Sequence, residues 1–180
     1  MILLMGRLFD AMEGLELFKS YHIPSQFLID YLDKHVRKYC QKCKRYKKSA
    51  SCPPFIEELE YYKNLFLLSE HAILIVQKFI IDDPKNWKEL GAKSSESLRK
   101  VMERLVKNLK LTNYYCFGGG SCKNCKICSV PCKFPKKRLI PIEGTGLNVV
   151  KLVKDIAEIY IKFPVEKYGY FYRVGMILWD

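Results

Sequence analysis

The sequence lacks any apolar run long enough to cross a membrane. Its longest apolar stretches, residues 2–5 and 72–81, fall well short of the roughly 20 residues that a membrane helix needs. A secretory signal is not expected, because no basic residue precedes the first stretch, no small-residue cleavage site follows it, and Asp10 and Glu13 come soon after. We therefore expect no membrane contact and a cytoplasmic location.

Histidine is scarce, and the patterns of several common catalytic sites are missing. His22, His35 and His71 form no cluster in the sequence, and a lone histidine on a helix face is usually structural. His35, just before Cys40, is the one alternative metal ligand among them. No phosphate-binding glycine loop ends in Lys and Ser or Thr. No catalytic constellation is predicted, and whether the protein is an enzyme stays open.

Acidic residues are absent between Asp33 and Glu57 and again between Glu103 and Glu143. Over the whole chain, 31 Lys and Arg against 19 Asp and Glu give a formal charge of +12. Such an excess suits an acidic partner, a nucleic acid or an anionic cofactor. Proteins from hyperthermophiles are also generally enriched in lysine, so the charge alone does not distinguish between these partners.

Cysteine is abundant, and every cysteine lies inside one of these two acid-free stretches. In a reducing compartment a dense cysteine pattern indicates metal binding or catalysis more than disulfides. We predict that all eight bind metal: Cys40, Cys43, Cys52, Cys116, Cys122, Cys125, Cys128 and Cys132.

The second cysteine block has the spacing of a ferredoxin run. Cys122, Cys125 and Cys128 follow at intervals of three, and Cys132 comes four residues later. A short loop wrapped around a four-iron cubane can aim such thiolates at different irons. In bacterial ferredoxins a proline directly follows the fourth cysteine, whereas here two residues intervene before Pro135. The block therefore predicts a four-iron, four-sulfur cluster.

The first block, Cys40-Gln-Lys-Cys43 followed by Cys52, supplies three more thiols. A lone C-x-x-C pair can be a redox dithiol, but the third cysteine and the missing strand before it favour metal ligation. With Cys116 the thiols number eight, which is the requirement of two all-cysteine cubanes. By analogy with two-cluster ferredoxins, Cys132 would join the first block and Cys116 would complete the second.

Other uses of the same residues stay open. Two tetrahedral zinc sites would take the same eight thiolates, giving a structural or interaction module. The basic residues of the first block, with Tyr39 and Tyr46 as stacking faces, would suit RNA, or form a solvated rim around the metal. An iron-sulfur protein would instead pass electrons to an acidic redox partner or serve as a redox accessory factor. An enzyme that leaves one iron open to substrate is a further alternative.

The patterns of apolar residues predict an α+β fold. Helices are expected over residues 25–40, 56–68, 94–113 (capped by Ser94 or Ser95) and 148–161, and strands over 72–81, 114–117 and 170–179. We expect a single compact domain over residues 1–180, with about four helices, a small sheet and two cysteine-rich metal-binding loops. Gly118 to Gly120 would allow close approach of the backbone to the metal.

Three groups of motifs together resemble one known family. They are Cys40-x-x-Cys43-x-x-Tyr46, Ser51-Cys52-Pro53-Pro54-Phe55, and the run from Gly120 to Cys132 followed by Pro135 and Glu143-x-x-Gly146-Leu147-Asn148-Val149. In this combination the chain resembles the predicted metal-binding family called domain of unknown function 2284. The resemblance implies cysteine-bound metal in proteins of archaea and anaerobic bacteria and brings no agreed reaction. It leaves residues 1–30 as an N-terminal extension, and Asn148 stands where the family more often has Asp.

Overall fold

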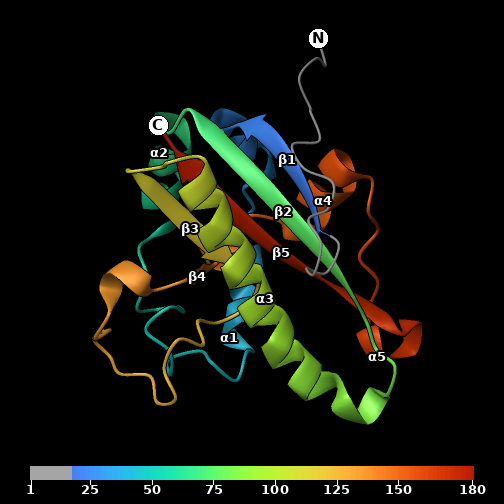
Figure 1. Ribbon diagram of the computed structural model, residues 1–180. Helices are drawn as coiled ribbons and strands as arrows, with labels where there is room; N and C mark the ends of the chain where they lie inside the picture. Colours follow the sequence, from blue (N-terminus) through green and yellow to red (C-terminus); the bar gives the residue numbers. More distant parts are fainter. Residues whose placement is uncertain (1–17) are drawn as a thin grey trace.

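A five-stranded sheet in the order β1-β2-β5-β3-β4 forms the centre of the computed structural model (Figure 1). Neighbouring strands are antiparallel, except that β4 runs parallel to β3. The structure describes residues 18–180, apart from the side chains of Pro84, Trp87, Lys88 and Glu166. The apolar residues 2–5 and most of the predicted extension lie outside that part. The strands are β1 (Phe18–Pro24), β2 (His71–Ile80), β3 (Tyr114–Gly118), β4 (Ile140–Pro141) and β5 (Tyr170–Trp179).

Helices lie on both faces of the sheet, and the fold is α+β, as predicted. The α-helices are α1 (Val36–Gln41), α2 (Leu59–Leu68), α3 (Trp87–Asn108), α4 (Val149–Ala157) and α5 (Val165–Tyr168). Short 3-10 helices are η1 (Ser25–Tyr31), η2 (Pro84–Asn86), η3 (Pro135–Lys137) and η4 (Ile142–Thr145). In the described part of the chain, no helix has the length and apolar character needed to span a membrane.

Strand β2 is buried on both faces of the sheet, which explains its continuous apolar sequence. Ile73 and Ile75 pack against Leu98 and Met102 of α3 on one face. Leu74 belongs to the larger core on the other face. That core also contains side chains from η1, α2, η4 and α4. The result is a sheet enclosed between α3 and a layer of smaller helices.

The helix predictions differ from the structure in extent: those over residues 56–68 and 148–161 are the shorter α2 and α4, and the other two differ more. Helix α3 begins at Trp87, so Ser94 and Ser95 do not cap it; their hydroxyls donate to the carbonyl of Gly91 at 3.1 and 2.9 Å. The single helix expected over residues 25–40 is divided into η1 and α1, because Leu32 is extended and pairs with Leu147. Long-range pairing therefore overrides the local periodicity at this point.

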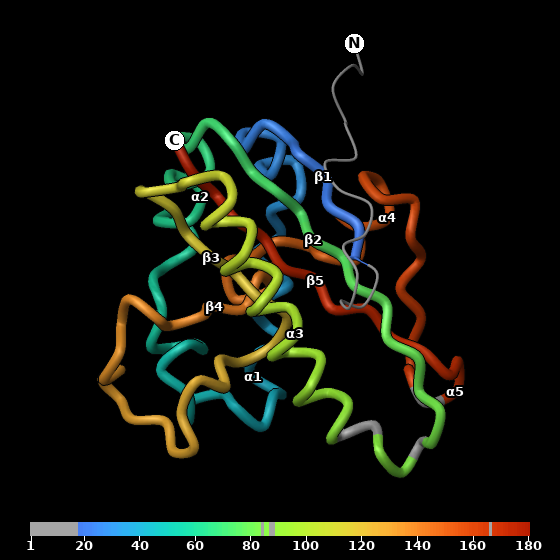
Figure 2. The backbone as a smooth tube through the Cα atoms, viewed as in Figure 1, coloured from blue at the N-terminus to red at the C-terminus, as the bar shows by residue number. Residues whose placement is uncertain are grey.

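Two loops that are far apart in the sequence lie side by side at one end of the sheet (Figure 2). The first connects α1 to α2, and the second, which includes η3, connects β3 to β4. Hydrogen bonds join them: the Cys122 backbone N–H donates to the Ser51 hydroxyl at 3.0 Å, and the Ala50 N–H donates to Cys128 Sγ at 3.4 Å. The fold thus brings the two cysteine-rich loops into contact.

Candidate metal centre

The four cysteines of the second block share one small pocket. Cys122, Cys125, Cys128 and Cys132 line it together with Ala50 and other residues of both loops. Cys125 and Cys128 are exposed, whereas Cys122 and Cys132 are partly buried. Four cysteines of an eleven-residue run therefore border one common space.

The segment Ser49-Ala50-Ser51 of the first loop holds the second block in place. All three residues are buried, and the two serine hydroxyls lie 3.0 Å apart. Cys128 Sγ accepts from the Ala50 N–H at 3.4 Å and lies 3.8 Å from the Ser49 hydroxyl. Backbone and hydroxyl donors of this kind stabilise a thiolate and tune any metal that it binds. The first loop therefore supplies an outer layer of hydrogen bonds to the second.

Cys40, Cys43 and Cys52 lie near one another where α1 ends and the first loop begins. The Cys43 N–H donates to the Cys40 carbonyl at 3.0 Å in the turn after α1. Burial raises the pKa of the Cys40 thiol, and the nearby Glu143, Cys52 and Cys43 add to the rise while Arg37 opposes it. The three thiols of the first block therefore act on one another electrostatically.

Cys52 is the most buried of the three. Burial raises the pKa of its thiol, and hydrogen bonds from Ser51 and Ser49 oppose that rise. Because the thiolate is the metal ligand, a metal bound here would have to displace a proton that burial retains. Metal affinity at the first block should therefore increase with pH.

Cys116 lies apart from these two groups of thiols. It is on β3, opposite Ile177, and packs on the face of the sheet that α3 covers. Burial raises the pKa of its thiol to about 12, with a further contribution from Glu103. Cys116 lines a cleft of about 1190 Å³ beside α3. Cys132, which we expected to join the first block, instead lines the pocket of the second block.

The donor set fits a sulfur-rich metal group. Within the part of the chain that the structure describes, no three His, Cys, Asp or Glu side chains already converge on the position of a single ion. Four thiols nevertheless line one pocket, with N–H and O–H donors directed at a sulfur and basic residues around them. A multi-iron group spreads its ligands over several metals, so Cys122, Cys125, Cys128 and Cys132 would hold it.

A comparison with known protein families matches residues 29–179 to the family described as predicted metal-binding protein (DUF2284). The chain belongs to this family. The match begins before Cys40 and covers every cysteine. Searches of curated proteins and of solved structures found no match. Metal binding is thus the property predicted for the family to which this chain belongs.

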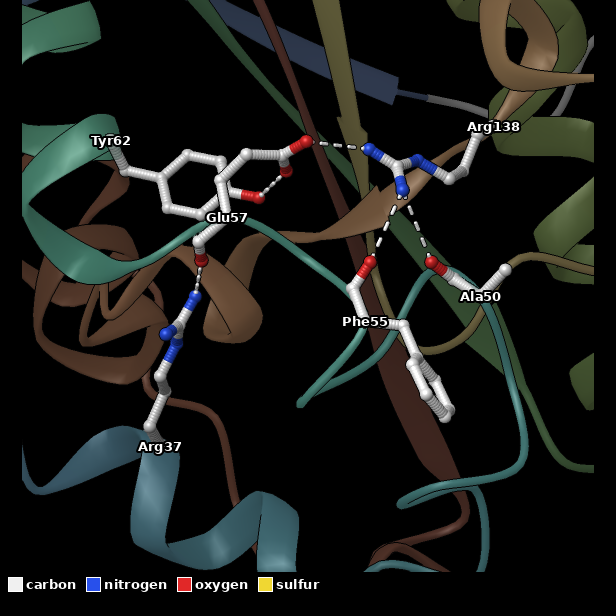
Figure 3. Close-up of polar contacts among 6 residues, drawn as sticks. All are labelled: Arg37, Ala50, Phe55, Glu57, Tyr62 and Arg138. Atoms are coloured by element: carbon white, nitrogen blue, oxygen red, sulfur yellow. Dashed lines mark hydrogen bonds and ion pairs between the residues drawn. The ribbon is translucent and has the colours of Figure 1, made fainter. Parts of the chain in front are cut away.

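Arg138, which sequence reasoning missed, links the two loops of the DUF2284 chain (Figure 3). Its guanidinium donates to the carbonyls of Ala50 and Phe55, each at 3.3 Å, and to the Glu57 carboxylate at 2.8 Å. Tyr62 donates to the other Glu57 oxygen at 2.7 Å. Burial alone would raise the pKa of Glu57, but these hydrogen bonds outweigh it and hold the pKa below its ordinary value.

A second arginine, Arg37 on α1, extends this network. It donates to the Glu57 backbone carbonyl (Figure 3). It also donates to the Gly144 carbonyl at 2.7 Å and to the Glu58 carboxylate at 3.2 Å. Helix α1, which ends beside the first cysteines, is thereby tied to η4 and to the segment before α2. No local pattern in the sequence indicated these contacts of Arg37 and Arg138, because their partners lie far away along the chain.

Glu143 was singled out only as part of the family motif. Its carboxyl group is buried, while the residue as a whole is partly exposed. Burial raises its pKa, against hydrogen bonds from its own N–H and that of Gly120 and the charge of Arg173. Gly120, with φ of 82°, begins the second cysteine loop. Glu143 therefore lies between the two blocks.

His35, the alternative metal ligand, and Gly118, which was expected to approach the metal, make other contacts in the structure. His35 precedes α1, where its backbone N–H donates to Asp33 at 2.8 Å. The Nε2 atom of His22 and the Nδ1 atom of His71 lie 3.3 Å apart, on neighbouring strands. The His22 ring stacks on Trp179, and the His71 ring is tilted against it. Gly118 is packed against Leu139, where a Cβ would collide with that side chain. The glycine at this position is thus explained by packing.

Proposed function

We propose that the chain is a cytoplasmic iron-sulfur protein with two four-iron, four-sulfur clusters, acting in electron transfer or as a redox accessory factor. The observation that carries the proposal is the second block: four cysteines with the spacing of a ferredoxin run line one pocket. Metal binding itself is predicted for the family to which the chain belongs. The cluster would supply one-electron chemistry, and the protein would supply ligands and surroundings.

The residues around the second block would stabilise the reduced form of a cluster bound there. N–H and hydroxyl donors directed at a ligating sulfur stabilise the more negative, reduced form of a cluster. The Ala50 N–H and the Ser49 hydroxyl lie in that position toward Cys128. Nearby lysines would act in the same direction, because positive charge favours the reduced state.

The surface over the second block has the composition of a docking site for an acidic redox partner. Ile127 is 88% exposed between two of the cysteines, and Phe134 is 53% exposed after the last one. Exposed lysines lie close to these apolar residues in the sequence: Lys126, Lys133, Lys136 and Lys137. An apolar centre within a charged rim is typical of an interface that must be both specific and reversible.

A zinc-binding module that contacts RNA is the second candidate. Tyr39 is 72% exposed, close in sequence to the exposed Lys38, Lys42 and Lys44, so a base could stack there while lysines bind phosphates. A third candidate is an enzyme, because the cleft beside α3 shares Asn124, Lys137 and Arg138 with the thiol pocket. In that case one iron would be open to a substrate.

Anaerobic purification followed by redox titration tests the proposal. An iron-sulfur protein would be brown, with broad absorbance at about 400 nm. Dithionite would bleach this absorbance, and mild reoxidation would restore it. A colourless protein that contains zinc, binds single-stranded RNA and loses that binding steeply with salt would overturn it. Absorbance that shifts only when a substrate is added would favour the enzyme.

A further inference from the structure

The cleft beside α3 is large enough to hold a small molecule. Its volume of about 1190 Å³ is a little above the roughly 300–1,000 Å³ of most ligand sites. Side chains of α2, α3, β3 and the loop that contains η3 line it. Asn124, Lys137 and Arg138 line both this cleft and the pocket of the second cysteine block, so the two spaces adjoin. Electron transfer by itself requires no such cleft.

The charged side chains of the cleft leave a positive excess. Its acidic residues are all in ion pairs of 2.5–3.1 Å: Glu57 with Arg138, Glu89 with Lys93, Glu96 with Lys100 and Glu103 with Arg99. Lys123, Lys136 and Lys137 also line the cleft, and none of them is in an ion pair with a described residue. The Asn124 side chain donates to the Lys137 carbonyl, which joins the segments of Lys123 and Lys137. An anionic ligand would therefore meet uncompensated positive charge here.

Lys123 shares its hydrogen-bond acceptor with a second cation. Lys123 Nζ donates to the Gly91 carbonyl at 3.3 Å, and Arg173 Nη2 donates to the same oxygen at 2.8 Å. The two cations therefore lie within the span of two hydrogen bonds. Burial lowers the pKa of Lys123, and the charges of Arg173 and Arg45 lower it further. Glu143 offsets part of the charge of Arg173, and an anion in the cleft would offset that of Lys123.

An aromatic ring lines the cleft close to these basic residues. Tyr61 is 45% exposed, and its ring makes a T-shaped contact with that of Tyr62, with 5.3 Å between centroids. The Tyr62 hydroxyl donates to the Glu57 carboxylate, which also accepts from Arg138 (Figure 3). Lys137 directly precedes Arg138. These contacts place an exposed aromatic face and an unpaired lysine in one region of the cleft.

We infer that this cleft binds a mononucleotide, with its aromatic ring stacked on Tyr61 and its phosphate bound by Lys123 and Lys137. Proteins bind nucleotides without sequence preference by this combination of aromatic stacking and basic side chains. The phosphate end of the ligand would lie toward the cysteine pocket, because Lys137 lines both spaces. The inference does not rest on the proposed function, since the cleft would bind the ligand whichever metal the thiols hold.

Isothermal titration calorimetry on the anaerobically purified full chain tests the inference. The probes are AMP, UMP and FMN, which carry a purine, a pyrimidine and a flavin ring. At least one of them should bind at low salt with a Kd of about 100 μM or tighter. The matching compound without the phosphate, and inorganic phosphate alone, should each bind roughly tenfold more weakly or worse, because each makes only part of the contacts.

A pair of double variants tests the lysines. Lys123→Gln with Lys137→Gln should weaken nucleotide binding by roughly tenfold or more, because the charged hydrogen bonds to the phosphate are lost. The matched control is Lys107→Gln with Lys126→Gln, which removes the same charge at exposed positions that do not line the cleft. The control should stay within about twofold of wild type at moderate salt, where distant charges are screened.

Variants of one tyrosine test the stacking. Tyr61→Leu should weaken nucleotide binding by roughly fivefold or more, whereas Tyr61→Phe keeps the ring and should bind as wild type does. Tyr61 is exposed on α2, where leucine is also a good helix former, so this variant should fold. Tyr39→Leu, at a 72% exposed tyrosine outside the cleft, should leave the binding unchanged.

Other results would overturn the inference. If none of the three nucleotides binds at about 1 mM, the cleft is not a nucleotide site. If the cleft variants bind as their controls do, the nucleotide binds elsewhere. Phosphate that binds as tightly as the nucleotides would leave only an anion site. A short single-stranded RNA that binds more tightly than every mononucleotide, through the same residues, would make RNA the ligand. None of these outcomes bears on the iron content, which tests the proposed function separately.

Discussion

Arg138 shows how single residues connect the two cysteine loops. Its side chain is only 20% exposed, and it donates to two backbone carbonyls of the first loop as well as to Glu57. Hydrogen bonds to charged groups are stronger than neutral ones, and a partly buried partner left unpaired is costly. The two cysteine-rich loops should therefore depend on this guanidinium for their relative position.

We predict that Arg138→Gln lowers the free energy of unfolding by about 1–3 kcal/mol. The matched control is Lys63→Gln, which removes the exposed ion pair between Lys63 and Glu60 at 3.3 Å and should cost about 0.5 kcal/mol or less. Urea unfolding of each purified variant measures both values. Equal effects of the two substitutions would contradict a linking role for Arg138.

Cys116 should behave as a buried thiol that binds no metal. With a pKa of about 12, only roughly a thousandth of it is thiolate at pH 9, where an ordinary exposed thiol is about half ionised. We predict that iodoacetamide labels it at least roughly a hundredfold more slowly than a thiol in a short peptide. Cys116→Ser should retain the wild-type metal content, and loss of metal in that variant would restore it as a ligand.

For single residues, the sequence predicts which residue types could bind metal but not which distant residues lie beside them. Spacing alone groups Cys122, Cys125, Cys128 and Cys132 in one run. Nothing local indicates that Glu143 approaches Cys40, because the two are joined only through the packing of η4 on α1. Contacts between distant segments depend on the whole fold, so the division of ligands between centres could not be read from spacing.

Helix α4 illustrates how one capping residue defines an element. The Asn148 side chain accepts a hydrogen bond from the Lys151 N–H at 3.1 Å, and the helix then buries Val149, Leu152, Val153 and Ile156 in the larger core. Asp, which the resemblance noted in the sequence implies more often at this position, would cap equally well. The substitution of Asp by Asn is thus conservative in structural terms.

We predict that Asn148→Ala lowers the free energy of unfolding by about 1 kcal/mol, because it removes the cap of α4. Asn148→Asp should match or slightly exceed wild type, since a carboxylate also favours the helix dipole. Thermal unfolding monitored by circular dichroism compares the three proteins. A loss of metal in Asn148→Ala without loss of stability would show that the residue has another role.

The elements that were predicted and missed differ in how local their causes are. Strand β5 and the core of α3 follow from apolar residues close in sequence, and both were found. Strand β1 alternates only weakly, and it is a strand because it pairs with β2 from Phe18↔Gln77 to Pro24↔His71. Strand β4 is only two residues long, Ile140–Pro141, and is defined by its pairing with β3. Edge strands of this kind depend on their neighbours.

At the scale of the molecule, the positive charge is distributed over the end that carries the two cysteine-rich loops and over other parts of the surface. The exposed Lys126, Lys133 and Lys136 belong to the second loop. The exposed Lys107, Lys110 and Lys154 belong to the end of α3 and to α4. This distribution allows two triple variants with the same net charge to be compared.

We predict that the triple Lys→Glu variant at positions 126, 133 and 136 slows reduction by dithionite by roughly threefold or more at low salt. The same change at positions 107, 110 and 154 should slow it less, because those charges lie farther from the metal. Reduction by cationic methyl viologen should show the opposite order. Stopped-flow absorbance measures each rate, and identical rates in the two variants would exclude electrostatic guidance to this end of the protein.

The most direct test of the whole account is the amount of iron and inorganic sulfide in the anaerobically purified chain. Two four-iron clusters predict about eight irons and eight sulfides per chain, with little zinc. About four of each would leave one cluster, with the first block serving another purpose. Two zinc ions without sulfide would contradict the central claim, because the gathered thiols would then hold single ions.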